Sequence, residues 1–146
     1  MAVSLHDAPF SPWSMLADYE STKLAHGAAG ACASFVGTMR DHNEGDAVVS
    51  MLLEHYPGMT ERELEAIEAD AAARWPLLAT LIAHRVGDIR VGDPIVLCAC
   101  WSSHRKAAFE ACRFLMEELK SRAPFWKKET LASGASRWVE RNTPGY

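Results

Sequence analysis

The fold is decided by residues 95–130, IVLCACWSSHRKAAFEACRFLMEELKSRAPFWKKET, in which two apolar segments flank a helical pattern. The first seven of these residues, 95–101, are apolar without polar alternation, which indicates a strand covered on both faces. Successive side chains of a strand point to opposite faces, so Cys98 and Cys100 share one. We expect two small core residues there rather than a redox pair.

A helix is predicted over about residues 104–120, with a buried stripe at helical spacing: Ala108, Cys112, Leu115 and Leu119. Ser102 or Ser103 is expected as its N-cap. Pro124 ends the helical region, because proline cannot continue a helix. The residues after it, 125–130, predict a strand. The side chains on one face of this strand are Phe125, Lys127 and Glu129.

The rest of the chain adds a second group of strands and two more helices. Apolar patterns predict strands over residues 30–40, 47–56 and 78–86, and helices over 9–20 and 60–75. The polar segment DHNEGDA after the first strand is predicted to be a mobile loop, and GDIRVGDP a turn. Because the strands come in groups rather than in strict alternation with helices, the chain is predicted to be an α+β domain, a mostly antiparallel sheet with about three helices.

Each of these two helices has a start signal. Ser11 or Ser14 is expected to cap the first, with Trp13 facing inward. Thr60 and Glu63 form a capping-box pattern for the second. Its apolar stripe comprises Leu64, Ile67, Ala71 and Trp75, and the acidic residues expected to face solvent are Glu61, Glu65, Glu68 and Asp70.

The composition is that of one packed domain spanning residues 1–146. Hydrophobic residues make up 49% and charged residues 23%, as in globular chains, so a core can form without disulfide or metal staples. No apolar run approaches the ~20 residues that cross a bilayer. The N-terminus lacks a basic segment followed by an apolar one, so a cytoplasmic protein is expected. The four cysteines show no C-x-x-C spacing, so neither a metal site nor a disulfide framework is expected.

Charge is distributed unevenly along the chain. Residues 1–73 carry 3 basic and 12 acidic side chains (−9), whereas residues 74–146 carry 12 and 7 (+5), for a net charge of −4. Residues 104–128 hold seven basic and three acidic side chains. Such an excess favours an anionic ligand, although a solvated helix face would give the same pattern.

His104 and Arg105 lie at the predicted start of a helix. A helix N-terminus presents unpaired N–H groups and the positive end of the helix dipole. A forked guanidinium beside it therefore makes a phosphate or carboxylate site. The alternative is that Arg105 pairs with a surface acid and His104 hydrogen-bonds within the fold.

Lys120 and Lys127 flank the Pro124 turn, which can bring their amines together. Two nearby ammonium groups lower one another's pKa, and burial beside Phe125 and Trp126 lowers it further. A lysine of this kind acts as a nucleophile or general base near neutral pH. An ordinary pair of surface lysines is the alternative.

Arg40 closes a predicted strand just before the polar loop, which is a common place for a ligand contact. His42, His55 and His84 are isolated and lack the spacing of metal ligands. We therefore expect these three histidines to be structural.

Five ordered blocks resemble the large, catalytic subunit of molybdopterin synthase over roughly residues 28–139. They are GACASFVGTMRDHNEGD, LEHYPGMTERELEAIEADAAARWP, IAHRVGDIRVGD, WSSHRKAAFEACRFLMEELKSRAPFWKKE and the pattern G-x-x-R-W-V at 134–139. The blocks H-R-x-x-A-F and L-K-x-x-x-P-x-W-K-[KR]-E are long and specific.

The resemblance implies an α/β-hammerhead type of α+β domain. It also implies a sulfurtransferase that converts cyclic pyranopterin monophosphate to molybdopterin by inserting two sulfurs as a dithiolene. The sulfur comes from a thiocarboxylate on the C-terminal glycine of a small ubiquitin-like partner, so neither a catalytic cysteine nor a permanently bound cofactor is implied. The implied assembly is a homodimer with one small subunit at each distal end, a heterotetramer. The first 27 or so residues and the last seven are implied to be peripheral.

The resemblance also implies which residues form the pocket. The catalytic residues are Lys120 and Lys127. The substrate-binding residues are Thr38, Met39, Arg40, His104, Arg105, Lys120, Lys127, Lys128 and Glu129. Residues 37–40 read G-T-M-R where the family more often has G-x-V-R, and the spacing from Glu129 to Trp138 is one residue longer than in some relatives. Arg141 is a candidate to complete the pocket of the other protomer.

A second class of function is a non-catalytic module that binds phosphorylated metabolites or nucleic acid. The chain is acidic overall, and no basic stripe is interleaved with aromatic residues, which argues against nucleic acid. Neither nucleic acid nor a membrane is therefore expected as a partner.

Overall fold

The computed structural model describes residues 1–140, which form nine strands and three helices. The strands are β1 (Ala2–His6), β2 (Ala31–Thr38), β3 (His42–Asn43), β4 (Asp46–His55), β5 (Leu77–Arg85), β6 (Gly87–Arg90), β7 (Pro94–Ser102), β8 (Phe125–Leu131) and β9 (Ser136–Val139). The helices are α1 (Pro12–Lys23), α2 (Met59–Arg74) and α3 (Arg105–Arg122). The predicted α+β class with mostly antiparallel strands is confirmed. None of the described helices is long and apolar enough to cross a membrane.

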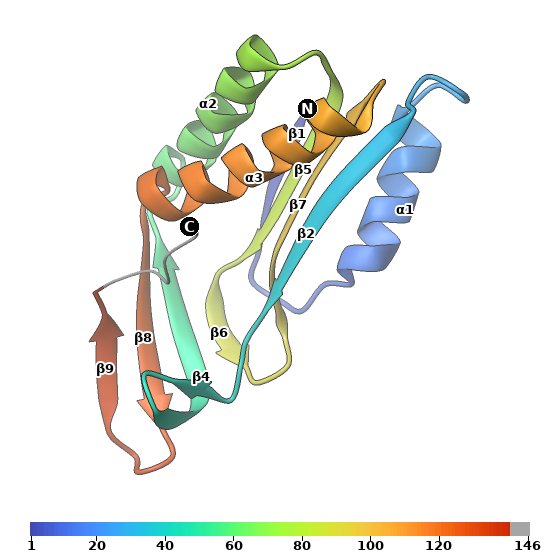
Figure 1. The fold of residues 1–146 in the computed structure, drawn as a ribbon. Helices are drawn as coiled ribbons and strands as arrows, with labels where there is room; N and C mark the ends of the chain where they lie inside the picture. The colour runs from blue at the N-terminus through green and yellow to red at the C-terminus, as the bar shows by residue number, and fades with distance from the viewer. Residues whose placement is uncertain (141–146) are drawn as a thin grey trace.

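The first sheet has the strand order β1-β5-β7-β2, in which β1 is parallel to β5 and the other pairs are antiparallel (Figure 1). Its central strands β5 and β7 come from two apolar segments that the sequence predicts as strands. The first 27 residues, expected to be peripheral, supply the edge strand β1 and the helix α1 of this domain. The last residues, 141–146, lie outside the described part of the chain.

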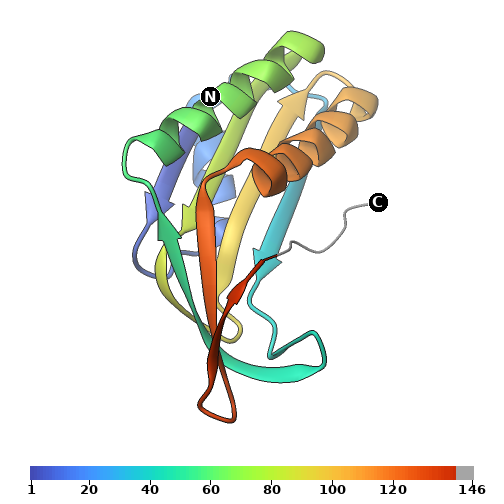
Figure 2. The ribbon, with the colours of Figure 1, turned by 90° about the vertical axis from the view of Figure 1, so that its left-hand side faces the viewer.

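Both faces of the first sheet are covered, with α2 and α3 on one side and α1 on the other (Figures 1 and 2). Alternate residues of β7 divide between these two layers. The layer under α2 and α3 takes Val96, Cys98 and Cys100. The layer beside α1 takes Leu97, Ala99 and Trp101. The prediction of a strand covered on both faces, with Cys98 and Cys100 together in the core, is therefore confirmed.

Helix α3 packs on the sheet through its predicted stripe, because Ala108, Cys112, Leu115 and Leu119 are all buried. The predicted serine cap is wrong, since His104 is the N-cap residue and makes no side-chain cap hydrogen bond. Ser102 instead ends β7, where its hydroxyl donates to the Pro76 carbonyl at 3.1 Å.

Helix α2 begins earlier than the capping-box pattern predicts. Gly58 is its N-cap, with φ at 81°, and the Gly58 N–H donates to the Glu61 carboxylate at 3.2 and 3.3 Å. Thr60 is buried, and its Oγ1 accepts a hydrogen bond from the Tyr56 N–H at 2.9 Å. The positive φ of glycine places the start of the helix two residues upstream of the threonine.

Two side chains lie on the opposite side from that predicted. Glu68 is buried, accepts a hydrogen bond from the Thr80 hydroxyl, and has its pKa raised by burial. Trp13 is 64% exposed. The α1 residues that pack on the sheet are Met15, Leu16 and Tyr19. Ser11, one of the two predicted caps, accepts a hydrogen bond from the Ser14 N–H at 3.3 Å.

The second sheet has the order β3-β4-β8-β9. The short strand β6 also pairs with β4, on the edge opposite β8. Its long strands connect directly to the helices, since β4 ends just before α2 and β8 begins just after α3 (Figures 1 and 2). Three of its strands, β3, β6 and β9, contain only two to four residues and lie in segments predicted as loop or turn, or not assigned. Its core consists of Met39, Val48, Met51, Leu53, Val86 and Ile89.

Candidate active site

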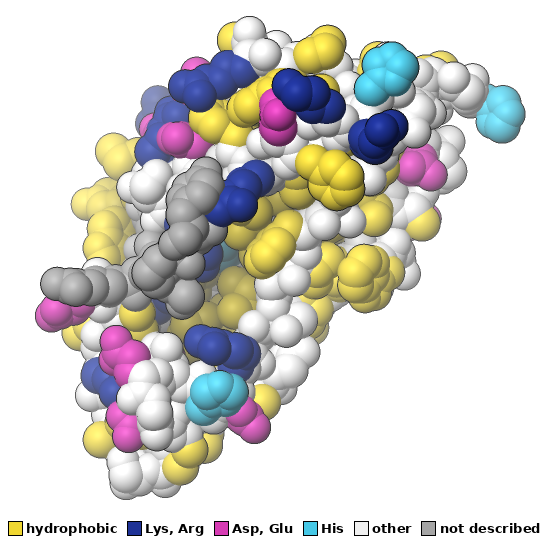
Figure 3. Space-filling view, in the orientation of Figure 1, with side chains coloured by type: hydrophobic (Ala, Val, Ile, Leu, Met, Phe, Trp, Pro, Cys, Tyr) yellow, Lys and Arg dark blue, Asp and Glu magenta, His cyan; other side chains and the backbone are white. Residues whose placement is uncertain are grey.

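A cavity of about 320 Å³ lies where the two sheets meet the C-terminal end of α3. Its walls come from the end of β2 and the residues after it, from α3, and from the paired strands β8 and β9. Figure 3 shows a hollow on this face, floored by hydrophobic side chains and edged by Lys and Arg. The predicted pocket residues that line the cavity are Thr38, Met39, Arg40, Lys120, Lys127 and Glu129.

Lys127 reaches the cavity from β8, on the same face as Glu129. Burial, together with the charge and close approach of Lys120, lowers the pKa of Lys127 to about 8, and Glu129 opposes this change in part. An amine with such a pKa is mostly protonated at pH 7 but releases its proton readily. Lys127 can therefore both bind an anion and exchange a proton.

Lys120 lies near the end of α3, and the chain turns at Pro124 so that β8 begins beside it. The structure thus brings together the two lysines that the sequence singles out. Lys127, whose pKa is lowered to about 8, is the amine that we expect to give up its proton.

His84 is a buried neighbour of both lysines. Its Nδ1–H donates to the Arg85 carbonyl oxygen at 2.8 Å, and its ring stacks on Phe125 with centroids 4.1 Å apart. Burial, with the charges of Lys120 and Lys127, lowers the pKa of His84 to about 3. The ring is therefore neutral at pH 7 and adds no charge to the cavity, in keeping with its predicted structural role.

The end of β2 and the residues directly after it form one wall of the cavity. Pairing with β7 shifts register between Gly37 and Thr38, and the Met39 N–H donates to the Asp93 carbonyl at 2.9 Å. The Met39 side chain is 6% exposed and belongs to the core of the second sheet. Arg40, the next residue, follows this anchored backbone into the cavity wall.

His42, predicted to be structural, also lines the cavity together with Asn43. The Nδ1 atom of His42 lies 2.8 Å from the Asp41 carboxylate, and this hydrogen bond lowers the pKa of Asp41. The predicted mobile loop contains β3, which pairs with the start of β4. The available sequence signal was the polar run D-H-N directly after a predicted strand, residues 30–40, that ends in arginine.

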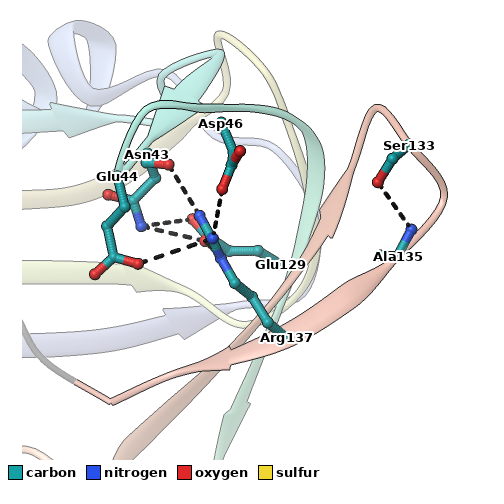
Figure 4. Close-up of polar contacts among 7 residues, drawn as sticks. All are labelled: Asn43, Glu44, Asp46, Glu129, Ser133, Ala135 and Arg137. Atoms are coloured by element: carbon teal, nitrogen blue, oxygen red, sulfur yellow. Dashed lines mark hydrogen bonds and ion pairs between the residues drawn. The ribbon is translucent and has the colours of Figure 1, made fainter.

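Glu129, which lines the cavity, belongs to a polar network at its rim. The network is drawn in Figure 4. Asn43 Nδ2 donates to both of its carboxylate oxygens at 3.1 Å, and Arg137 Nε donates to Oε1 at 3.2 Å. Arg137 also pairs with Asp46 (2.8 Å) and Glu44 (3.9 Å) and donates to the Asn43 carbonyl at 2.9 Å. One guanidinium thus connects β9, β8 and the turn between β3 and β4.

Three of the predicted pocket residues do not line this cavity. His104 and Arg105 lie at the other end of α3 from Lys120, and fifteen residues of helix separate Arg105 from Lys120 by about 22 Å. Lys128 points to the opposite face of β8 from Lys127, where its ammonium lies 5.6 Å from the centroid of the Trp138 ring. Arg141 lies outside the described residues.

The cavity offers cations, an imidazole and apolar walls, and residues 1–140 contain no cluster of three or more His, Cys, Asp or Glu that could hold a metal ion. Such an arrangement binds an anion and exchanges protons with it. Fold and site together define a class: an α+β protein with a cationic pocket at the junction of two sheets. The chain belongs to the MoaE protein family, whose model matches residues 5–122.

Individual relatives agree with this assignment. The molybdopterin synthase catalytic subunit of Pseudomonas aeruginosa is 50% identical over 140 residues, which cover 96% of this chain and 91% of that protein. The molybdopterin biosynthesis MoaE protein from Burkholderia ambifaria has a TM-score of 0.80 at 44% identity, covering 99% of this chain and 94% of that one. Molybdopterin synthase from Staphylococcus aureus gives 0.83 at 29% identity, covering 94% and 96%. The resemblance read from the sequence is confirmed.

Proposed function

We propose that this chain is the catalytic subunit of a molybdopterin synthase. It converts cyclic pyranopterin monophosphate to molybdopterin with sulfur from a thiocarboxylated, ubiquitin-like small subunit. The observation that carries the proposal is the pair of neighbouring lysines, Lys120 and Lys127, in a cationic cavity, in a chain half identical to a molybdopterin synthase catalytic subunit. Both reactants, a cyclic phosphate and a thiocarboxylate, are anions that such a cavity attracts.

The cavity divides into a part for charge and a part for the pterin. Arg40 stands at the rim, where its forked guanidinium can bind phosphate oxygens in a bidentate manner. Thr38 offers a hydroxyl to the polar edge of the ring system. The apolar lining of Phe35, Met39 and Val139 provides walls for a flat heterocycle.

The two lysines divide the chemistry. In each transfer the thiocarboxylate sulfur bonds to a side-chain carbon of the pterin in place of a carbon–oxygen bond, which gives a thioester. Water then attacks the acyl carbon, the acyl C–S bond breaks, and the sulfur stays on the substrate while the glycine leaves as a carboxylate. During that attack the carbonyl oxygen gains negative charge, and an ammonium beside it stabilises that charge. We assign this role to Lys120. Lys127, with a pKa of about 8, takes up and returns the proton that moves in each sulfur transfer.

The sulfur enters on the small subunit, so the reaction requires neither a nucleophilic cysteine of this chain nor a resident cofactor. All four cysteines are free thiols. Free thiols are typical of a reducing compartment, and we place the reaction in the cytoplasm.

We assign His104 and Arg105 to the pocket of a second copy of the chain, because α3 places them about 22 Å from Lys120 of the same copy. Two copies would form a homodimer, and one small subunit on each would complete a heterotetramer. Light scattering at micromolar concentration, without the small subunit, is expected to give twice the chain mass of 16.1 kDa. A monomeric mass would contradict this assembly.

Arg105→Ala is expected to lower turnover about 10- to 100-fold, the worth of one charge-assisted hydrogen bond of roughly 1.5–3 kcal/mol. Fold and partner binding should be retained, because Arg105 is exposed at the start of its helix. Mixing with Lys120→Ala chains tests which copy Arg105 serves. In a two-fold dimer each hybrid has one intact pocket, so about a quarter of the wild-type activity should return after random exchange. Absence of recovery would show that Arg105 does not act across the dimer.

Reconstitution tests the proposed function itself. The purified chain is mixed with the thiocarboxylated small subunit and cyclic pyranopterin monophosphate, and dithiolene formation is scored. The control is the same small subunit ending in an ordinary carboxylate, which can bind but cannot supply sulfur. A complex that survives gel filtration yet forms no dithiolene would refute the catalytic role.

A further inference from the structure

Arg137 and Glu129 lie directly opposite one another on β9 and β8, and in the same ladder Val139 lies opposite Lys127. Because strand side chains alternate between faces, these four side chains share the cavity side of the two strands. Glu129 is 9% exposed and Arg137 28%. Glu129 is also two residues from Lys127, about 7 Å along the strand, so this carboxylate has a cation on either side.

The side-chain hydrogen bonds that Glu129 makes with residues 1–140 are directed to the Arg137 side. Asn43 and Arg137 donate to its carboxylate, and the guanidinium is itself held by Asp46 and the Asn43 carbonyl. We propose that Arg137 is a positioning residue that holds Glu129 in this network, and so prevents the carboxylate from pairing with Lys127. The charge of Glu129 is thereby directed to Arg137 and away from the Lys127 amine. The importance of this arrangement for turnover rests on the proposed function, but the arrangement itself does not.

The charged groups around Lys127 determine how the pairing of Glu129 with Arg137 affects the Lys127 amine. Within residues 1–140, the titratable and charged groups around Lys127 in the cavity are Lys120 from α3, Glu129 from β8, His84 from β5, and Arg40 and His42 from the segment after β2. Among these, Glu129 alone is acidic, and it raises the pKa of Lys127 against the effect of burial. The pairing of Glu129 with Arg137 also raises the pKa of Arg137, so the guanidinium stays charged. Without that guanidinium, Glu129 would act on Lys127 with its full charge.

The test follows the Lys127 amine directly, as the pH dependence of its side-chain carbon signals in NMR, assigned by their loss in Lys127→Met. Arg137→Gln is expected to raise the pKa of Lys127 by about one unit, the lower end of the effect of a close opposite charge. Arg137→Lys keeps the charge and should leave the pKa near that of the wild type. The alkaline shift should also appear in the pH profile of dithiolene formation. The control is Lys23→Gln, which removes an exposed positive charge from α1, on the far side of the first sheet.

A second variant separates charge from simple loosening of the rim. If Arg137→Gln only admitted water, the pKa of Lys127 would stay high when Glu129→Gln is added. The proposal expects the double variant to return to the wild-type value or below. Failure of Arg137→Gln to shift the pKa, or of Glu129→Gln to reverse the shift, would overturn it.

If Arg137→Gln does not fold, Glu129→Gln alone remains informative, because glutamine keeps the same shape. Since Arg137 already neutralises most of the Glu129 charge, the pKa of Lys127 should fall by only a few tenths. A fall of a full unit would show that Glu129 acts on Lys127 despite Arg137. All these titrations are independent of activity, so failed reconstitution would count against the proposed function and not against this inference.

Discussion

Lys127→Met is expected to abolish dithiolene formation and, at pH 7, to make the folded chain more stable. Loss of the amine removes the group that exchanges the proton, which is worth about 10²- to 10⁴-fold in rate. The folded wild type holds this ammonium partly buried beside Lys120, and its pKa is therefore about 8 instead of 10.5. Methionine fills a similar volume without charge. We therefore expect the free energy of unfolding of Lys127→Met at pH 7 to exceed that of the wild type by about 1–3 kcal/mol.

The sign of this gain can be followed with pH. Between pH 8 and 10.5 the unfolded chain binds more protons at this lysine than the folded chain does, so wild-type stability rises with pH in that range. Below pH 8 both states are protonated and the cost of the buried charge is constant. The advantage of Lys127→Met should therefore be full at pH 7 and decline to nothing near pH 10.5.

Urea unfolding of both proteins at pH 7, 9 and 10.5 measures the difference. Lys128→Met is the matched control for stability, because it removes the same group from the opposite face of β8, where the ammonium lies over the Trp138 ring. It should give no gain at any of the three pH values. A Lys127→Met variant less stable than the wild type at pH 7 would show that the buried ammonium does not lower the free energy of unfolding.

The core of the site could be predicted because it depends on short-range periodicity. Alternation along β8 places Lys127 and Glu129 on one face, and the helical stripe of α3 fixes which side of the helix Lys120 occupies. Pro124 then forces a turn between the two lysines. Burial and proximity follow from these local constraints, and so does the lowered pKa of Lys127.

The rim of the cavity could not be predicted in the same way. β3 and β9 are two and four residues long, too short for an apolar pattern, so nothing in the sequence placed Arg137 opposite Glu129. The start of α2 was missed because Gly58 adopts a positive φ, a choice that depends on the neighbouring turn. The separation of Arg105 from Lys120 follows from the length of the helix alone. The family resemblance, however, gives only a set of pocket residues. It does not say whether they come from one copy of the chain or from two.

Lys120→Arg is expected to be nearly as damaging as Lys120→Ala, with both lowering dithiolene formation at least about 100-fold, while the small subunit still binds. Arginine keeps the positive charge, so it should hold an anion at the end of α3. It cannot supply the compact, rotating ammonium that reaches a carbonyl oxygen, and it does not release its proton near neutral pH. If Lys120 also attacks the acyl carbon, only an amine will serve.

The pKa of Lys127 separates the charge of Lys120 from its chemistry. The positive charge of Lys120 lowers that pKa, so Lys120→Arg should leave it near 8, whereas Lys120→Ala should raise it. Turnover is measured with purified variants and the thiocarboxylated small subunit, and complex formation by gel filtration. If Lys120→Arg keeps both the low pKa of Lys127 and near-normal turnover, charge alone suffices, and the nucleophile or proton-transfer role of Lys120 must be abandoned. If it keeps the pKa but loses turnover, the amine of Lys120 itself takes part in the transfer of sulfur.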